Sequence, residues 1–337
     1  MKGRCLLRND RYLLEPDETA HPARIGWYPP EPPAGETVVA IGTFDGVHLG
    51  HQAIVGQAAE LAFKQGAACV AVTFEPHPRH VLNPASALPI LTPLPERVRL
   101  LLQSGAAAVA VITFDRKLAA LDAETFVDCV LRRQLRARGV VAGFNFGFGR
   151  NRSGSAATLE RFGEKAGLAV RIVQPVESGG RVVSSSEIRR LLQEGDVKEA
   201  ARLLGRAYRV GGVVVKGDGR GRALGYPTAN VRPDPLQLVP ADGVYLALLD
   251  GMPALAVISA RPTFGQDARR WLEVHVLEGW WELYGRQVSV DLLQKLRPIV
   301  RFESAQKLAA QIEADRRSAL AYFAAAREPH LQQRPGV

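Results

Sequence analysis

The composition of this chain is that of a globular protein long enough for two domains. It has 337 residues, of which 47% are hydrophobic and 23% charged, and a formal net charge of +9. The longest apolar runs, such as Ala106 to Phe114, are too short to cross a bilayer, and early charged residues exclude a signal-peptide core. Its basic residues are dispersed, so the charge fits phosphorylated small molecules as well as nucleic acid.

The three cysteines, Cys5, Cys69 and Cys129, are scattered and form no C-x-x-C pair. This spacing argues against disulfides and against a structural zinc site. We therefore expect the protein to work in a reducing, cytoplasmic setting.

The first part of the chain predicts an α/β domain after an extended lead-in. Residues 1–36 end in a proline-rich stretch, which favours extended backbone. Beyond it, apolar strand-like runs alternate with helical patterns, and this alternation predicts a parallel sheet with helices on both faces. The strands are expected at residues 38–41, 69–74, 108–114, 140–143 and 169–173. The helices are expected near residues 49–65, 94–104, 123–137 and 156–166.

A glycine-rich turn separates the first predicted strand from the first predicted helix. His48 and His51 are three residues apart, so both imidazoles should lie on one side of the first helical turn. Glycines at positions 42, 46 and 50 allow the backbone to approach a ligand closely. A helix N-terminus attracts phosphate, so the pair is a candidate polyphosphate clamp. The alternative is two surface histidines beside a tight turn.

The turn resembles the T/HxGH signature of nucleotidyltransferases, which transfer a nucleotidyl group from a nucleoside triphosphate. The resemblance implies that the two histidines hold the triphosphate and stabilise charge on the α-phosphate, without a covalent intermediate. Positioned positive charge is what such transfer chiefly requires. The turn also follows the carboxyl end of a parallel strand, where ligands of such sheets bind. The chain contains no G-x-x-x-x-G-K-[ST] motif of a P-loop protein.

Three further motifs follow predicted strands of this domain. The first is Phe-Glu-Pro-His-Pro at 74–78. The second, at 143–149, alternates aromatic residues with glycine and could form a wall for a flat ring. The third, at 183–189, begins a helix whose serines and Arg189 could bind one phosphate, although the serines could equally be a plain helix cap.

After about residue 206 the pattern changes to short alternating strands. They are expected at residues 209–215, 244–249, 255–259, 271–277 and 287–292, separated by glycine and proline turns. This pattern predicts a small antiparallel barrel. A closing helix is expected from about Glu303 to Arg327, and residues 328–337 are expected to be disordered.

Two stretches of the barrel carry candidate chemistry. Thr228 and Asn230 are two residues apart, so in an extended segment both could touch Mg²⁺ bound to ATP phosphates. The alternative for this glycine-rich stretch is a β-turn with an Asx-type bond. Further on, Glu273 and His275 alternate with Leu272 and Val274. An inward-facing Glu273 would be a candidate general base, whereas an outward-facing one would be ordinary surface.

Taken in order, these motifs resemble those of the prokaryotic bifunctional riboflavin kinase/FAD synthetase family over about residues 37–325. The first domain matches at GxFDGxHxGH, FEPHP, a GxDFxFG-like segment and SSTxIR. The second matches at GxGRGRxLGYPTAN, RPTF (261–264), the ExH strand and LYG (283–285). The implied fold is a Rossmann-like nucleotidyltransferase domain at 37–205, followed by an antiparallel-barrel riboflavin kinase domain at 206–327.

The resemblance implies two activities. The barrel would phosphorylate riboflavin to FMN with ATP and Mg²⁺, and the first domain would transfer AMP from a second ATP to FMN. The products would be FAD and pyrophosphate. The expected partners are therefore riboflavin, FMN and ATP, with no nucleic acid and no membrane, in a monomer or weak homo-oligomer.

The resemblance also assigns site residues. Glu273, His48 and His51 would be catalytic, with Glu273 activating the ribityl 5′-hydroxyl. The nucleotide positions of the first domain would be Gly42, Phe44, Asp45, Gly46, His48, Gly50, His51, Asn145, Ser184, Ser185, Ser186 and Arg189. Those of the kinase would be Gly217, Gly219, Gly221, Arg222, Pro227, Thr228, Asn230 and Glu273, with Thr228 and Asn230 on the metal.

Five positions depart from the family pattern. Asn145 stands where many members have Asp, and Ser186 replaces the usual Thr but keeps the hydroxyl. In the kinase half, Val257, Ser259 and Ile299 also differ from the common residues. These last changes bear on riboflavin affinity.

Two other functions compete with this prediction. In one, only the first domain is active and the barrel is a flavin-binding module, which a test of riboflavin phosphorylation would decide. In the other, the protein uses its positive net charge to bind nucleic acid in response to flavin. Such a protein would show salt-sensitive RNA or DNA binding.

Overall fold

A computed structural model of the chain describes residues 5–8, 11–14, 23–217, 226–260, 270–279 and 282–331. Its contacts divide the chain into two compact units, one ending at Ser185 and the other beginning at Ser186. The sequence placed the domain boundary at 205. Between the two positions lie most of helix α7 (Ser185–Glu194) and all of helix α8 (Val197–Leu204).

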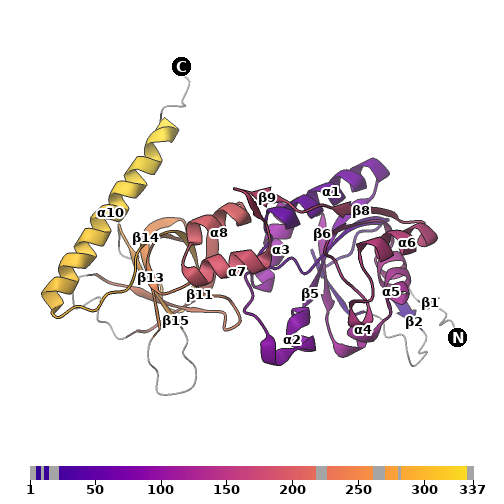
Figure 1. The fold of residues 1–337 in the computed structure, drawn as a ribbon, viewed down its shortest axis with the longest axis horizontal. Coiled ribbons are helices and arrows are strands. Elements are labelled where there is room, and N and C mark those ends of the chain that lie inside the picture. The colour runs from indigo at the N-terminus through magenta and orange to yellow at the C-terminus, as the bar shows by residue number, and fades with distance from the viewer. Residues whose placement is uncertain are drawn as a thin grey trace. The chain divides into compact units, whose positions relative to one another are not determined.

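The first unit is built on a six-stranded sheet with the strand order β3-β6-β5-β4-β7-β8. Strands β5, β6 and β8 of this sheet are labelled in Figure 1. The five predicted strands form its parallel part, because β4 pairs with β5 and β7, β5 with β6, and β7 with β8, all parallel. The bounds of these strands are β4 (Thr37–Ile41), β5 (Ala68–Glu75), β6 (Ala108–Thr113), β7 (Ala137–Gly143) and β8 (Ala169–Val173). The predicted parallel sheet is confirmed.

Helices cover both faces of this sheet. Successive residues of β4 explain why, since Val38 and Ala40 belong to one apolar core and Val39 and Ile41 to another. The helices of the unit are α1 (Leu49–Gln65), α2 (Pro78–Leu82), η1 (Pro84–Ser86), α3 (Leu94–Gln103), α4 (Arg116–Ala120), α5 (Ala123–Thr125), η2 (Phe126–Gln134), η3 (Arg150–Arg152) and α6 (Ala156–Ala166). The helix predicted at 123–137 is thus α5 followed by η2, a π-helix that ends at Gln134.

Part of the expected extended lead-in, residues 25–28, is a strand of the sheet. Strand β3 (Ile25–Tyr28) joins the sheet antiparallel to β6, with Trp27 opposite Ala110. Its four residues are too few to show a strand pattern, and pairing with β6 supplies the hydrogen bonds. Two short hairpins complete the unit, β1 (Cys5–Arg8) with β2 (Arg11–Leu14) and β9 (Glu177–Ser178) with β10 (Arg181–Val182).

The second unit contains a closed barrel with the strand order β11-β12-β15-β14-β13-β16. All its pairs are antiparallel, and β11 closes the barrel by pairing with β16. The strands are β11 (Tyr208–Val215), β12 (Ala229–Pro233), β13 (Gly243–Leu249), β14 (Met252–Ala260), β15 (Arg270–Val276) and β16 (Gln287–Arg297). The predicted barrel is confirmed, with β12 as a strand that the sequence indicated only as an extended segment.

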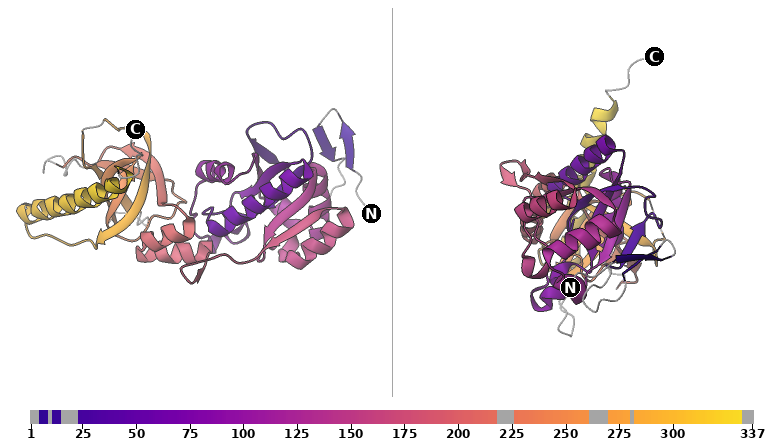
Figure 2. Two further views of the ribbon diagram at one scale, coloured as in Figure 1. Left: turned by 90° about the horizontal axis from the view of Figure 1, so that it is seen from above. Right: turned by 90° about the vertical axis from the view of Figure 1, so that its right-hand side faces the viewer.

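Helix α10 (Ala305–Leu331) closes the barrel on its outer face (Figure 2). Ala319 packs against a cluster of barrel residues that includes Val244, Leu246 and Leu255. The helix is assigned as far as Leu331, and the disorder expected for residues 328–337 stays a prediction. Residues 332–337 lie outside the described residues.

Helices α7 and α8 pack on this barrel too. Contacts join α8 to β11 and β16, and the Ala241 N–H donates to the Leu192 carbonyl of α7 at 3.0 Å. Leu192, Val197 and Leu203 are fully buried. Within the described ranges, every helix is too short or too polar to cross a lipid bilayer.

Candidate active sites

The turn after β4 has an unusual backbone that aims the start of α1. Phe44, Gly46 and Val47 have positive φ angles of 51°, 94° and 39°. Non-glycine residues rarely adopt such angles, so surrounding contacts must hold them. One of these contacts is at the Thr43 carbonyl, which accepts bonds from Thr73 Oγ1 at 2.9 Å and from Arg97 Nη1 at 3.1 Å.

His48 and His51 stack on each other at the start of α1. Their ring centroids are 3.6 Å apart with an interplanar angle of 16°. His48 is the N-cap of the helix, since its Nδ1 accepts the His51 N–H at 3.3 Å. The ring of Phe44 meets His51 edge-on, with centroids 5.2 Å apart. The predicted proximity of the two imidazoles is confirmed.

Two of the turn's glycines leave space for these rings. A Cβ at Gly50 would lie 3.2 Å from His48 Cε1, and a Cβ at Gly42 would lie 3.2 Å from Phe44 Cε1. An alanine at either position would therefore require the neighbouring ring of His48 or Phe44 to shift by a few tenths of an ångström.

Asp45 has a different environment from the one expected of a phosphate-binding residue. Its side chain is buried, with 1% exposure. The carboxylate accepts the backbone N–H of Leu91 at 2.8 Å and of Thr92 at 3.0 Å. Its backbone carbonyl accepts the Ser185 hydroxyl at 2.8 Å. A buried carboxylate engaged in this way shapes the turn, and Phe44, which is fully buried, does the same.

Arg97, for which sequence analysis proposed no role, supports the same turn. It lies in α3 with 1% exposure and forms an ion pair with Glu75 of the Phe-Glu-Pro-His-Pro motif. Its bond to the Thr43 carbonyl connects this ion pair to the histidine turn. The only signal in the sequence was a basic residue on the apolar side of an amphipathic helix.

Only part of the aromatic segment after β7 is exposed to a ligand, although the sequence predicted a wall for a flat ring. Phe146 and Phe148 stack with centroids 5.4 Å apart and pack on the hydrophobic core. Phe144 is 45% exposed and remains available to a ligand. Asn145 lies beside it, with its Oδ1 3.4 Å from where a Cβ at Gly143 would stand.

The remaining residues predicted for the first site belong to the start of α7. Ser184 and Ser185 are half-buried and lie in the first unit. Ser186 is exposed and Arg189 is buried, and both belong to the second unit.

In the barrel, Asn230 of β12 stands directly opposite Glu273 of β15. Directly opposed residues of an antiparallel pair share a face of the sheet and lie within side-chain contact range. Leu272 and Val274 are buried in the barrel interior, so Glu273 is on the outer face and half-buried. Sequence analysis left the orientation of Glu273 open, and the structure places its half-buried side chain beside Asn230, on the face of β15 opposite Leu272 and Val274.

The side-chain amide of Asn230 is held in a confined place. Asn230 is only 6% exposed, and no described residue forms a hydrogen bond with its Oδ1. A Cβ at Gly217 would lie 2.0 Å from Asn230 Nδ2, so any larger residue there would displace the amide. A buried amide oxygen without a donor is available to a metal ion.

The segment before Asn230 is fixed from two sides. His275 Nδ1 lies 2.9 Å from the Pro227 carbonyl, and the Tyr226 hydroxyl donates to Glu313 of α10 at 3.2 Å. Desolvation, reinforced by the Glu313 carboxylate, raises the pKa of Tyr226 and keeps its hydroxyl a donor. Half-buried Thr228 follows this segment directly.

Other predicted kinase positions have no description in the structure. Gly219, Gly221 and Arg222 lie outside the described residues, as does the segment 261–264. Of the departures from the family pattern, Val257 stands opposite Glu273 on β14 and packs on the core under α10. Ser259 pairs with Trp271, and Ile299 is 42% exposed.

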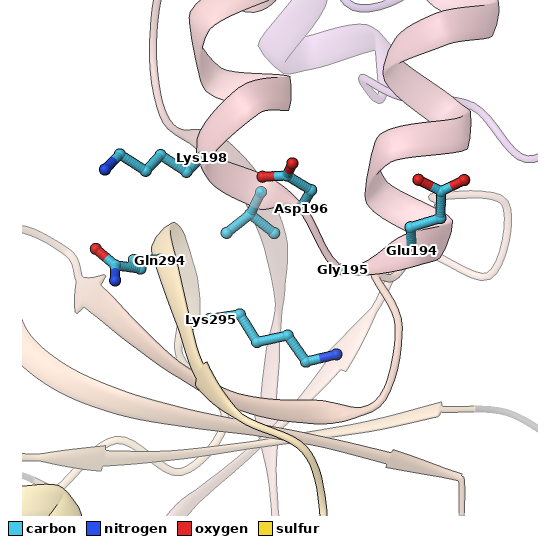
Figure 3. Close-up of a pocket in the computed structure, with 7 residues that line it drawn as sticks. Glu194, Gly195, Asp196, Lys198, Gln294 and Lys295 are labelled. Atoms are coloured by element: carbon cyan, nitrogen blue, oxygen red, sulfur yellow. The ribbon is translucent and has the colours of Figure 1, made fainter.

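A cavity also opens in the second unit, between the α7–α8 turn and β16 (Figure 3). It is lined by side chains of both charges, among them Asp196, Lys198 and Lys295. None of the predicted site residues lines it. Among the described residues, no group of three or more His, Cys, Asp and Glu side chains has a metal-binding arrangement.

These features define a protein with a nucleotidyltransferase-like unit joined to a small antiparallel barrel. A family model described as FAD synthetase matches residues 31–187, and one described as riboflavin kinase matches residues 204–323. The chain belongs to the family of bifunctional riboflavin kinase/FMN adenylyltransferases.

Two curated relatives and one solved structure are similar to this chain over most of its length. The bifunctional riboflavin kinase/FMN adenylyltransferase of Listeria monocytogenes is 35% identical over 292 residues, covering 85% of this chain and 92% of that protein. The Escherichia coli K12 protein of the same description is 37% identical, with coverage of 85% and 92%. A crystal structure described as a macrolide-efflux protein from Streptococcus pneumoniae has a TM-score of 0.78 at 32% identity, covering 85% of this chain and 94% of its own.

Proposed function

We propose that this protein makes FAD from riboflavin in two ATP-dependent steps. The second unit phosphorylates riboflavin to FMN, and the first unit transfers AMP to FMN. The observation that carries this proposal is that each family model matches a different part of the chain, one in each half.

In the kinase step, the 5′-hydroxyl oxygen of riboflavin attacks the γ-phosphorus of ATP. The bond from that phosphorus to the bridging oxygen breaks, and ADP leaves. We assign to Glu273 the removal of the hydroxyl proton, because a carboxylate on the outer face beside Asn230 can reach a substrate bound there. Pro227 and the glycines at 217, 219 and 221, with Arg222, are assigned to the nucleotide.

Asn230 and Thr228 are the residues that would hold Mg²⁺ with the ATP phosphates. The unpartnered, buried Oδ1 of Asn230 fits this role, since Mg²⁺ prefers oxygen ligands. When bound, the ion would neutralise phosphate charge during transfer.

In the second step, a phosphate oxygen of FMN attacks the α-phosphorus of ATP, and pyrophosphate leaves. The stacked imidazoles of His48 and His51 and the N-terminal end of the α1 dipole favour negative charge at this place. Gly42, Gly46 and Gly50 let the phosphates approach. Asn145, Ser184, Ser185, Ser186 and Arg189 are assigned to the nucleotide, and Phe44 and Asp45 to holding the turn.

The experiment that tests the proposal is a product analysis of purified protein with riboflavin, ATP and Mg²⁺. Chromatography should show FMN first and FAD later. FAD formed only from supplied FMN would restrict the activity to the first unit, and the absence of both products would overturn the proposal. We also expect a monomer or weak homo-oligomer, which sedimentation analysis would test.

A further inference from the structure

His275 has a hydrogen-bonding state that the structure itself defines. Its Nδ1 lies 2.9 Å from the Pro227 carbonyl, and a carbonyl oxygen can only accept. Nδ1 therefore carries the proton, and in the neutral ring Nε2 keeps its lone pair and acts as an acceptor.

Among the described residues, no hydrogen-bond donor reaches the Nε2 acceptor of His275. Nε2 of His275 is buried and has no hydrogen-bond partner among the residues that the structure describes. Buried polar atoms of native proteins are nearly always paired, because leaving one unpaired is unfavourable. The described part of the chain does not supply the missing donor, which leaves this atom open to a bound ligand.

A second unpartnered acceptor lies on the same face of the barrel. Asn230 is opposite Glu273, and His275 follows Glu273 by two residues on the same strand. Asn230 and His275 are therefore diagonal neighbours across β12 and β15, which places their side chains within about 8 Å of each other. Asn230 Oδ1, like His275 Nε2, is buried and has no partner within the described ranges of the chain.

The ring of His275 is also fixed in orientation. Tyr226 meets it edge-on with centroids 5.7 Å apart, and the Tyr226 hydroxyl is bound to Glu313. With Nδ1 bound to Pro227 as well, Nε2 points in one direction before any ligand arrives. Preorganisation of this kind is what a binding group needs.

We propose that His275 is a further substrate-binding and positioning residue of the kinase site. Its Nδ1–H fixes the carbonyl of Pro227, immediately before Thr228. Its Nε2 accepts a hydrogen bond from a hydroxyl of the ribityl chain or from a water of the metal–ATP complex. Both are neutral donors, whereas a phosphate oxygen would meet a lone pair and be disfavoured. This inference rests on the proposed riboflavin kinase activity.

The test separates the two nitrogens by substitution in the full-length protein. His275→Asn keeps an N–H near the position of Nδ1 and removes the acceptor at Nε2. His275→Gln puts an amide group near Nε2 and loses the bond to Pro227. His275→Phe keeps the ring shape and removes both. The measurements are kcat and KM for riboflavin and for ATP with Mg²⁺, with FMN adenylylation and thermal unfolding as controls.

We expect His275→Asn to raise one KM by roughly ten-fold with little change in kcat, the scale of one lost hydrogen bond. A rise for riboflavin identifies the ribityl hydroxyl, and a rise for ATP identifies the metal-bound water. His275→Gln should restore that KM in part but lower kcat, because Thr228 is then less well placed, and His275→Phe should show both losses.

Unchanged KM values in His275→Asn, with an active wild type, would overturn the role of Nε2 alone. Unchanged kcat in both His275→Gln and His275→Phe would overturn the positioning of Pro227. A wild-type protein that does not phosphorylate riboflavin would overturn the proposed function, and this inference with it. FMN adenylylation at the wild-type rate should accompany every variant, because these residues belong to the second unit.

Discussion

Asn230 and Glu273 stand opposite each other on β12 and β15, with Gly217 packed against the amide of Asn230. This pairing gathers an amide oxygen and a carboxylate on one outer face of the barrel. The residues are far apart in the sequence, and only the antiparallel register brings them together. The register thus makes this face the candidate kinase site.

Gly217→Ala should weaken riboflavin phosphorylation, because its Cβ would lie 2.0 Å from Asn230 Nδ2 and force the amide to move. We expect the KM for ATP with Mg²⁺ to rise by about ten-fold, the scale of one displaced polar contact. Gly211→Ala is the matched control, since its Cβ would meet no atom closer than 3.8 Å. Equal KM values in both variants would contradict the assignment of Asn230.

Glu273→Gln should lower kinase turnover by roughly 10²- to 10⁴-fold, because glutamine keeps the shape of the side chain but cannot take the hydroxyl proton. Riboflavin binding should change little, and adenylylation of supplied FMN should not change. Single-turnover phosphorylation and riboflavin affinity, measured on the same variant, decide the point. Intact turnover with weak binding would make Glu273 a positioning residue.

His51→Ala and His48→Ala should each slow the conversion of FMN to FAD by about 10²-fold, the scale of one lost donor to the transition state. His48→Ala should also destabilise α1 by about 1 kcal/mol, because His48 is its N-cap. His48→Asn separates the two effects, since asparagine is a good N-cap without an imidazole. FAD synthesis at the parental rate in His48→Asn would show that His48 serves only as a cap.

Asp45→Ala should lower the free energy of unfolding of the first unit by about 3 kcal/mol, because it leaves the N–H groups of Leu91 and Thr92 buried without an acceptor. Asp122→Ala is the control, as that exposed carboxylate caps a helix through Thr125 and should matter by about 1 kcal/mol. Denaturant unfolding measures both. Equal losses would mean that the Asp45 carboxylate is not needed to hold the 91–92 backbone.

A fragment that begins at Ser186 should fold and phosphorylate riboflavin better than one that begins at Arg206. The shorter fragment lacks α7 and α8, whose buried residues include Leu192 and Leu203. Exposing the barrel surface under them should lower its thermal stability. Equal melting temperatures and kinase rates for the two fragments would support the boundary expected from the sequence.

Much of the fold could be predicted from local sequence patterns. Buried parallel strands show as continuous apolar runs, so all five parallel strands were found, and period-two alternation revealed five barrel strands. Short strands at the edge of the sheet could not be predicted in this way. Strand β3 has four residues, and its place depends on pairing with β6.

The sequence by itself also determined the proximity of His48 and His51, because residues three apart at a helix start share a side whatever the rest of the fold does. Tertiary structure alone decided the rest of the two sites. It buried Asp45 against Leu91 and Thr92, and it put Glu273 on the outside of the barrel opposite Asn230. Those relationships depend on strand register and long-range packing, which local patterns do not encode.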